Sequence, residues 1–534
     1  MTKREDHLAA LRAQTFDVLV IGGGATGAGT ALDAATRGLK VALIERDDFS
    51  AGTSSRSTKL IHGGVRYLEQ AVKKFDRSQF NLVRDALKER AVLLNIAPHL
   101  AKPLAIVTPL YQLYEVPYFM TGLKMYDALA GKANLAPSRF VDAKEALQRF
   151  PMLKKQDLRG GVVYYDGQFD DARMNVMIAM TAAQEGAAVA NHLEVTALRK
   201  QAGRLCGASV RDRLSQETWD IDAKVIVNAT GPFADAIRRM DDPRAPEMLR
   251  ASSGVHIILD KKFSPPETGL LIPQTEDGRV LFLLPWLDHT LVGTTDQAAP
   301  IEDHPQATED DIEYILRHLR KYFDTPAKRE DVLATWSGLR PLVSDPKAAD
   351  TARLSRDHVI NISDSGLLTI AGGKWTTYRK MALDTVDEVI KLGNIVTDRG
   401  SHTETLKLIG AKHYSPLGAA ELESEYQLDR DVASYLNRAY GDRAKEVAAL
   451  AKDGYGARLV DDQPYLEAEV IYTAQHEAAC TVVDVLARRV RLGFLNHAAT
   501  HAAVPRVAEL LAETLQWDEA RTRQEQDQAF AYFQ

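Results

Sequence analysis

An α/β fold is predicted from three features of the first fifty residues. An apolar strand is expected over residues 17–21, a helix over 28–37 and a second strand over 40–44. The turn that opens the helix fits the pattern G-x-G-x-x-G and reads Gly22-Gly23-Gly24-Ala25-Thr26-Gly27. Such a turn alone is weak evidence, because it also occurs without a ligand. The full order of strand, turn, helix and strand is typical of a Rossmann-like domain that binds a dinucleotide.

The glycines of this turn have distinct predicted roles. Gly22 permits the tight turn, Gly24 lets the backbone approach a pyrophosphate, and Gly27 lets the helix pack on the strand. The helix N-terminus offers N–H groups and a partial positive charge to the phosphates. Glu45 ends the second strand, where its carboxylate can accept hydrogen bonds from ribose hydroxyls and would repel a 2′-phosphate. The segment therefore predicts an ADP-containing dinucleotide other than NADP.

Size and composition indicate a globular protein of several domains. The 534 residues suffice for two or three domains, and 45% hydrophobic with 26% charged residues is usual for such proteins. The net charge of −7 gives no reason to expect a nucleic-acid partner. Two cysteines, Cys206 and Cys480, do not make a disulfide scaffold and suit a reducing compartment. No apolar leader or spanning segment is recognisable, so a cytoplasmic location is expected, with attachment to a membrane surface left open.

A segment rich in hydroxyl and glycine residues follows Glu45 and covers residues 53–67. Such a composition cannot build a core. The segment is either a solvated loop or a loop that lies along a polyanionic cofactor, with hydroxyls and backbone N–H groups on its phosphates. Its position after the acid favours the second interpretation. The residues predicted to contact the cofactor here are Thr53, Ser54, Ser55 and Lys59.

This segment also carries a resemblance. Residues 52–69, GTSSRSTKLIHGGVRYLE, resemble the flavin-contacting segment of FAD-dependent glycerol-3-phosphate dehydrogenases, in the glycine-oxidase and D-amino-acid-oxidase-like superfamily. Nearly the whole chain is similar, with the family patterns SGxRPL, xRD and GGKxTTY at 337–342, 355–357 and 372–378. No second G-x-G-x-x-G occurs, so no separate nicotinamide domain is expected. The resemblance implies a tightly held FAD.

The resemblance implies three domains. The Rossmann-like FAD-binding domain is expected to be discontinuous and to comprise residues 1–75, 155–245 and 335–392. An antiparallel-sheet substrate domain is expected over 76–154 and 246–334. An all-α C-terminal domain is expected over 405–534, after a polar linker, and docking or a homodimer contact is considered for it.

Two further turns are predicted to reach the cofactor. A buried strand over 224–228 ends in Ala229-Thr230-Gly231, which either returns to the nucleotide site or is an ordinary strand-to-helix turn. Gly372 and Gly373 precede a helix expected over 375–392 and allow close approach of a ligand. The predicted contacts of this second turn are Gly372, Gly373, Lys374, Trp375 and Thr376.

The resemblance also implies an activity. The substrate would be sn-glycerol 3-phosphate, oxidised to dihydroxyacetone phosphate by hydride transfer from C2 to flavin N5, with a membrane quinone as the electron acceptor. Arg340 and Arg356 would clamp the phosphate, because a planar guanidinium matches phosphate oxygens bidentately. Arg66 and Lys374 would lie near the flavin and the reacting carbinol. His256 is the candidate to take the C2 hydroxyl proton, and the division of roles among Arg66, His256 and Lys374 stays open.

Several alternatives remain at this stage. The protein could be an oxidase that uses oxygen, an amino-acid oxidase of the same superfamily, or a non-catalytic flavin-bound scaffold or sensor. The aromatic residues of 111–126 either pack in the core or form an interfacial patch, which would suit peripheral attachment to the inner face of the cell membrane. His476 and Cys480 would share a face of a helix expected over 465–491, and a structural helix is preferred there to a metal site.

Overall fold

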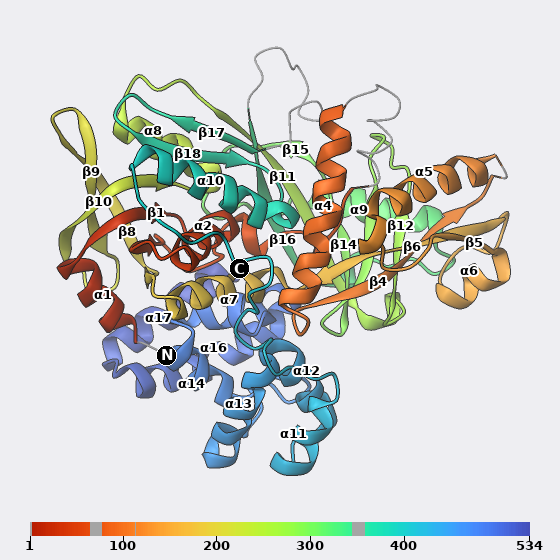
Figure 1. Cartoon of the computed structure of the whole chain (residues 1–534). Coiled ribbons are helices and arrows are strands. Elements are labelled where there is room, and N and C mark those ends of the chain that lie inside the picture. Colours follow the sequence, from red (N-terminus) through yellow and green to blue (C-terminus); the bar gives the residue numbers. More distant parts are fainter. Residues whose placement is uncertain (1–2, 65–76, 113, 344–357) are drawn as a thin grey trace.

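The computed structural model describes residues 3–64, 77–112, 114–343 and 358–534. Two sheets stand side by side, and a group of C-terminal helices lies across one end of them (Figure 1). The predicted α/β fold with an antiparallel-sheet part and a helical C-terminal part is confirmed. The exact domain boundaries stay a prediction.

The first sheet has eight strands and a parallel centre. β1 (Thr15–Ile21) lies between β2 (Val41–Ile44) and β10 (Thr218–Asn228), parallel to both. The remaining strands are β7 (Ala188–Ala190) and β18 (Leu367–Gly372), which are parallel to their inner neighbours, and β8 (Leu193–Gln201), β9 (Arg204–Asp212) and β17 (His358–Ile362), which pair antiparallel.

Both faces of this sheet are covered, because its strands alternate between two apolar cores. Val18 and Val20 of β1 contact the core under three helices, whereas Leu19 and Ile21 contact the opposite core. The three helices are α2 (Ala25–Thr36), α7 (Asp171–Gln184) and α10 (Tyr378–Leu392). The opposite core includes residues of α1 (Arg4–Ala13) and α8 (Ala234–Asp241). The parallel edge that carries the glycine-rich turn is thereby fixed from both sides.

The second sheet has ten strands and is mostly antiparallel. Its strands are β3 (Leu60–Ile61), β4 (Ala101–Leu110), β5 (Arg139–Asp142), β6 (Gly160–Phe169), β11 (Leu249–Asp260), β12 (Thr268–Ile272), β13 (Leu281–Trp286), β14 (His289–Gly293), β15 (Gln297–Ala298) and β16 (Val332–Val343). The pairing of β4 with β12 is parallel. The helices beside this sheet are α4 (Arg77–Ile96), α5 (Glu115–Ala130), α6 (Ala143–Arg149) and α9 (Glu309–Tyr322).

The C-terminal helices share an apolar core with the second sheet, and this core includes Trp336 of β16 and Phe494. These helices are α11 (Gly418–Tyr426), α12 (Arg430–Tyr440), α13 (Ala444–Leu450), α14 (Glu467–His476), α15 (Leu492–Leu495), α16 (His497–Leu515) and α17 (Glu519–Tyr532). A π-helical turn, Asp484–Arg489, lies between α14 and α15. The helical domain is therefore packed onto the rest of the chain and is not an appended module.

The structure corrects two local expectations from the sequence. The helix expected over 465–491 ends at His476, so His476 and Cys480 do not share a helix face. The sequence also predicts that Pro341 stops the strand directly after Arg340, but β16 continues through Pro341 to Val343. Because β16 is an edge strand that pairs only with β11 among the described strands, the missing N–H of Pro341 interrupts no second ladder.

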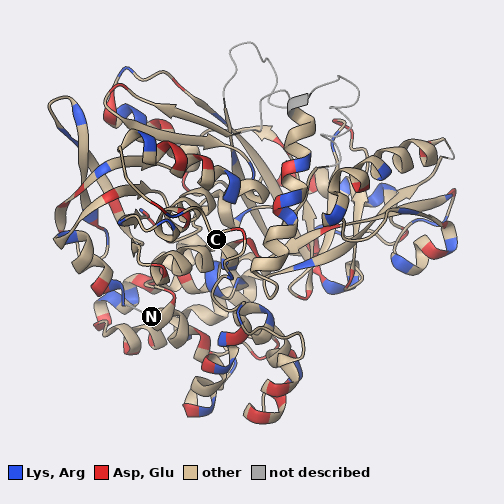
Figure 2. Cartoon of the chain, viewed as in Figure 1, with Lys and Arg blue, Asp and Glu red and all other residues tan. Residues whose placement is uncertain are grey.

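Acidic and basic residues are interspersed along both sheets and the C-terminal helices (Figure 2). Among the described residues, no helix is both long and apolar enough to span a membrane. The aromatic residues of α5 and its N-cap differ in exposure: Tyr126 is buried, whereas the N-cap Tyr114 is 76% and Tyr118 is 49% exposed. The core interpretation therefore holds for Tyr126, and the interfacial patch stays a prediction for the exposed residues.

Candidate active site

A cavity of about 1660 Å³ lies where the two sheets and the C-terminal helices meet. The predicted site residues that line it are Gly22, Gly24, Glu45, Thr53, Ser54, Ala229, Thr230, Gly231, His256, Arg340, Gly372, Gly373, Lys374, Trp375 and Thr376. Gly27, Ser55 and Lys59 do not line it. Arg66 and Arg356 lie outside the described residues. The structure thus gathers turns from distant parts of the sequence around one space.

The glycine-rich turn is held against the Ala229-Thr230-Gly231 turn. Gly22 has a φ of +110°, and a Cβ there would lie 2.6 Å from the carbonyl oxygen of Ala229. A Cβ on Gly27 would lie 1.8 Å from the carbonyl oxygen of Gly22, so this glycine lets α2 pack on the turn, as predicted. Gly24, the N-cap of α2, provides no side-chain cap. The helix therefore presents its N-terminus to the cavity.

Glu45 is fixed at the end of β2 by backbone N–H groups. Its Oε2 accepts from Gly23 N at 2.6 Å, and its Oε1 accepts from Asp47 N at 2.9 Å. Burial raises the pKa of Glu45, and the charge of Asp47 raises it further, against these hydrogen bonds. The carboxylate keeps a fixed orientation at the cavity wall, which suits a partner that offers hydroxyl donors.

The loop after Glu45 is joined to the other turns by hydrogen bonds. Ser54 Oγ accepts from Ala25 N of α2 at 2.9 Å, and the carbonyl of Ser54 accepts from Trp375 Nε1 at 2.9 Å. Thr53 Oγ1 donates to the carbonyl of Leu339 in β16 at 2.6 Å. One short loop thus connects the glycine-rich turn, the Gly-Gly turn after β18 and the strand that carries Arg340.

Lys59 is directed away from the cavity. Its Nζ is fully buried and donates to Asp171 Oδ2 and to the carbonyl of Ser55, both at 2.7 Å. It also lies 4.5 Å from the ring centre of Trp336. Burial lowers the pKa of Lys59 to about 7, against the raising effect of Asp171. In this arrangement Lys59 supports the wall behind the site.

His256 on β11 is the titratable residue best placed for proton transfer. It is 2% exposed, lines the cavity, and stacks on Trp336 at 4.0 Å between ring centres. Its Nε2 lies 3.0 Å from Thr58 Oγ1. Burial lowers the pKa of His256 well below its usual value, and the positive charges of Lys59 and Arg340 lower it further. The imidazole is therefore neutral at pH 7 and able to accept a proton.

Arg340 forms the cavity wall next to His256 and is held by several oxygens. Its guanidinium donates to the carbonyl of Ser253 at 3.2 Å and to Asp296 Oδ1 at 3.3 Å. It also donates to Thr294 Oγ1 and to the carbonyl of Thr295, both at 3.1 Å. The orientation of Arg340 is thus set by the turn after β14.

Two groups of cavity residues were missed in the sequence. Arg279 lines the cavity and pairs with Asp296, a residue whose Gly-Thr-Thr-Asp turn was considered structural. The C-terminal domain contributes Thr481, Asp484, Arg488 and Tyr532.

Among the described residues, no group of three or more His, Cys, Asp or Glu side chains is placed to hold a metal ion. The size of the cavity, the helix N-terminus and the fixed Glu45 together fit an extended dinucleotide.

Known proteins share this arrangement. Residues 17–379 match the family described as FAD dependent oxidoreductase, and residues 401–522 match the C-terminal domain of alpha-glycerophosphate oxidase. The mitochondrial glycerol-3-phosphate dehydrogenase of Homo sapiens is 50% identical over 548 residues, covering 99% of this chain and 75% of that protein. The probable mitochondrial enzyme of Caenorhabditis elegans is 51% identical, covering 98% and 74%.

Solved structures agree with these matches. The glycerol-3-phosphate dehydrogenase of Bacillus halodurans, complexed with FAD, has a TM-score of 0.81 and 30% identity, covering 99% of this chain and 97% of that chain. The glycine oxidase of Geobacillus kaustophilus has a TM-score of 0.53 and 18% identity, covering 76% and 100%, and it shows the fold alone. The chain therefore belongs to the FAD-dependent oxidoreductase family and, within it, to the glycerol-3-phosphate dehydrogenases.

Proposed function

We propose that this chain oxidises sn-glycerol 3-phosphate to dihydroxyacetone phosphate with FAD as its cofactor. The observation that carries the proposal is the position of His256. A buried, neutral imidazole lies in the same cavity as the glycine-rich turn, with Arg340 and Lys374 also on the wall. A base and cationic groups beside a dinucleotide site are the parts that oxidation of a phosphorylated alcohol requires.

FAD, when bound, supplies the hydride acceptor at N5. The residues named as its contacts would hold it: the helix N-terminus at Gly24 receives the pyrophosphate, Glu45 the ribose, and the turn after β18 the ring end. His256 takes the proton of the C2 hydroxyl as C2 loses hydride, so that the carbinol becomes a ketone. Lys374 stabilises the negative charge that develops on the substrate oxygen.

The phosphate of the substrate is assigned to cationic side chains on the other side of His256. Arg340 is the main contact, and the neighbouring Arg279 adds positive charge on the same wall. Arg66 and Arg356 complete the proposed set, the first near the flavin and the second on the phosphate. A planar guanidinium whose orientation is already fixed loses little side-chain entropy when it binds phosphate.

Replacement of Arg340 by alanine is expected to raise KM for glycerol 3-phosphate. One charge-assisted contact is worth about 1.5–3 kcal/mol, which corresponds to a rise of about 10-fold to 150-fold. Steady-state kinetics with Arg340→Ala measure this rise. Arg317→Ala, on the exposed part of α9, is the matched control and should leave KM unchanged. An unchanged KM in Arg340→Ala would refute the phosphate contact.

The activity itself is tested by anaerobic reduction of the purified holoprotein. Glycerol 3-phosphate is expected to bleach the flavin absorbance, whereas glycerol without the phosphate is not. A flavin that glycerol 3-phosphate leaves oxidised would support the non-catalytic scaffold or sensor. Reoxidation of the reduced protein by a quinone analogue, compared with oxygen, separates the dehydrogenase from the oxidase.

The acceptor and location are part of the same proposal. We assign a membrane quinone as the acceptor, which requires peripheral contact with the inner face of the cell membrane. The exposed Tyr114, at the N-cap of α5, and Tyr118 on α5 support this contact, because aromatic rings suit the boundary of lipid headgroups. A homodimer formed through the C-terminal domain belongs to the proposal as well.

A further inference from the structure

The C-terminal domain contributes a wall of the cavity at the end marked by Glu45. Asp484 and Arg488, in the π-helical turn after α14, line the same space as Glu45, Asp47 and His192. Since Glu45 and its neighbours mark the ribose end of the dinucleotide site, this end is enclosed by two parts of the chain that are far apart in sequence.

A continuous set of hydrogen bonds joins the glycine-rich turn to this wall. Gly23 N donates to Glu45, and the backbone of Glu45 and Asp47 accepts from the segment at 192–193: Leu193 N to Glu45 O at 2.8 Å and His192 N to Asp47 O at 2.6 Å. The His192 ring continues the set, with Nε2 lying 2.8 Å from Asp484 Oδ2.

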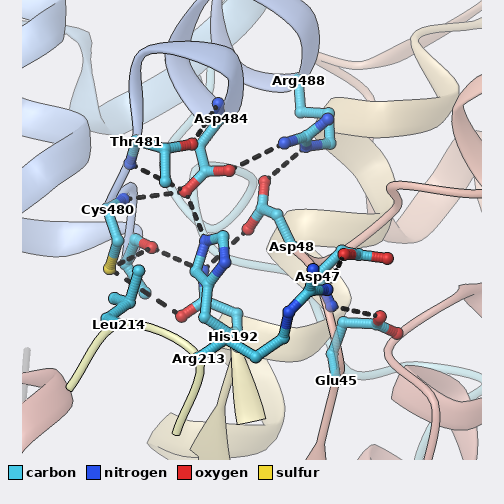
Figure 3. Close-up of polar contacts among 12 residues, drawn as sticks. Glu45, Asp47, Asp48, His192, Arg213, Leu214, Cys480, Thr481, Asp484 and Arg488 are labelled. Atoms are coloured by element: carbon cyan, nitrogen blue, oxygen red, sulfur yellow. Dashed lines mark hydrogen bonds and ion pairs between the residues drawn. The ribbon is translucent and has the colours of Figure 1, made fainter. Parts of the chain in front are cut away.

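The set is closed by arginines of the C-terminal domain (Figure 3). Arg488 Nη2 donates to Asp484 Oδ1 at 2.7 Å, and Arg488 Nε donates to Asp48 Oδ2 at 2.6 Å. Arg489 Nη1 donates to the same Asp48 oxygen at 2.8 Å. The segment after β2 is therefore tied to the C-terminal domain both directly, through Asp48, and indirectly, through His192.

Burial makes these contacts mutually dependent. Asp48, Asp484 and Arg489 have fully buried side chains. Burial lowers the pKa of His192, but the charge and hydrogen bond of Asp484 outweigh this effect and raise it, which favours the charged imidazolium. A buried charge that loses its partner is strongly unfavourable, so the segment at 45–48 and the C-terminal domain cannot separate without opening the whole cluster.

We infer that binding of FAD and docking of the C-terminal domain onto the first sheet stabilise each other, with the cluster of Asp48, His192, Asp484 and Arg488 as the link. The inference rests on FAD occupying this cavity and needs no particular substrate. A cofactor that contacts Glu45 and Asp47 further stabilises the backbone groups on which His192 is held. By thermodynamic linkage, docking of the domain must raise the association constant for FAD by the same factor by which FAD raises the equilibrium constant for docking.

The first test uses the unmodified full chain, with and without FAD. Hydrogen exchange is measured in α12 and α13, which do not line the cavity and so report docking, not contact with the cofactor. FAD is expected to slow exchange in both helices. Identical exchange rates in the apo- and holoproteins would overturn the inference.

The second test measures FAD affinity in Asp484→Asn, which keeps the size of the side chain and removes its charge. Titration of the apoprotein, followed by flavin fluorescence, is expected to give a Kd about 5-fold to 150-fold higher than in the unmodified chain. Asp462→Asn, an exposed change in the same domain, is the control and should leave Kd unchanged.

Two outcomes, one of the FAD titration and one of the anaerobic reduction, separate the coupling from the proposed function. A variant with faster exchange in α12 and α13 but an unchanged Kd for FAD would overturn the coupling. A protein that binds FAD normally but is not bleached by glycerol 3-phosphate would end the proposed function and leave the coupling intact. If Asp484→Asn does not fold, the hydrogen-exchange comparison of the unmodified apo- and holoproteins alone decides whether the inference holds.

Discussion

A His256→Gln variant is expected to turn over glycerol 3-phosphate about 10²–10⁴-fold more slowly than the unmodified enzyme while it retains FAD. Glutamine approximates the size of the imidazole but cannot accept the hydroxyl proton. Anaerobic stopped-flow reduction of the flavin measures the effect on the chemical step directly. His289→Gln, on the neighbouring strand β14, is the control and should leave the rate unchanged.

The same base predicts a pH profile. Because burial and nearby cations hold the pKa of His256 below 6.5, the imidazole is already neutral at pH 6.5, and the acid-side fall of kcat/KM is expected at still lower pH. An acid limb centred near pH 7, or a variant that keeps the full rate of flavin reduction, would remove His256 from the proton-transfer role.

An Arg173→Met variant is expected to lose about 3–5 kcal/mol of the free energy of unfolding, because Glu477 would remain buried without its partner. Arg173 lies on α7 and is 1% exposed, and its Nη2 donates to Glu477 Oε1 at 2.8 Å and to the carbonyl of Ala439 at 3.1 Å. Both partners belong to the C-terminal domain. Denaturant unfolding followed by circular dichroism measures the loss.

The matched control for this change is Arg523→Met on α17, which removes an arginine from an exposed ion pair with Glu519. Exposed pairs contribute about 0–1 kcal/mol, so the midpoint of unfolding should barely move. Equal losses of unfolding free energy in the two variants would show that the buried pair stabilises the fold no more than an exposed pair does. A double variant, Arg173→Met with Glu477→Leu, should recover much of the lost stability, because it leaves no unpaired buried charge.

Local patterns in the sequence predicted the conformation and packing of the glycine-rich turn. The role of Gly27 follows from a steric contact with Gly22 within the same turn, whereas the close approach at Gly22 is made by the distant Ala229. The position of His256 on a strand was also predictable, because alternation in β11 places it on one face of the sheet. These features depend on short-range geometry, which the sequence encodes directly.

The charged contacts between segments were not predictable from spacing alone. Asp296 was interpreted as part of a structural turn, yet it holds both Arg279 and Arg340 through tertiary contacts. The pair Arg488 and Arg489 was visible in the sequence, but its partner Asp48 lies at the other end of the chain. Such pairings arise only when the chain is folded, since no periodicity relates their positions.

An interruption of an expected strand was missed for a related reason. The sequence predicts one strand over 188–198, but the structure divides it into β7 and β8 at His192, which has a φ of +54°. A residue other than glycine in this conformation needs support from its surroundings, here the contact with Asp484. Propensity alone assigns such a position to the strand, and only the tertiary contact shows why the strand stops.

The wide separation in sequence of the cavity walls has a consequence for biosynthesis. The walls run from Gly22 to Tyr532, so a nascent chain cannot enclose the cavity until nearly all of it has left the ribosome. Long-range contacts of this kind also slow folding, because distant segments must meet before they gain stability. A polypeptide that ends just before α17 would therefore lack the last part of the cavity wall, which includes Tyr532.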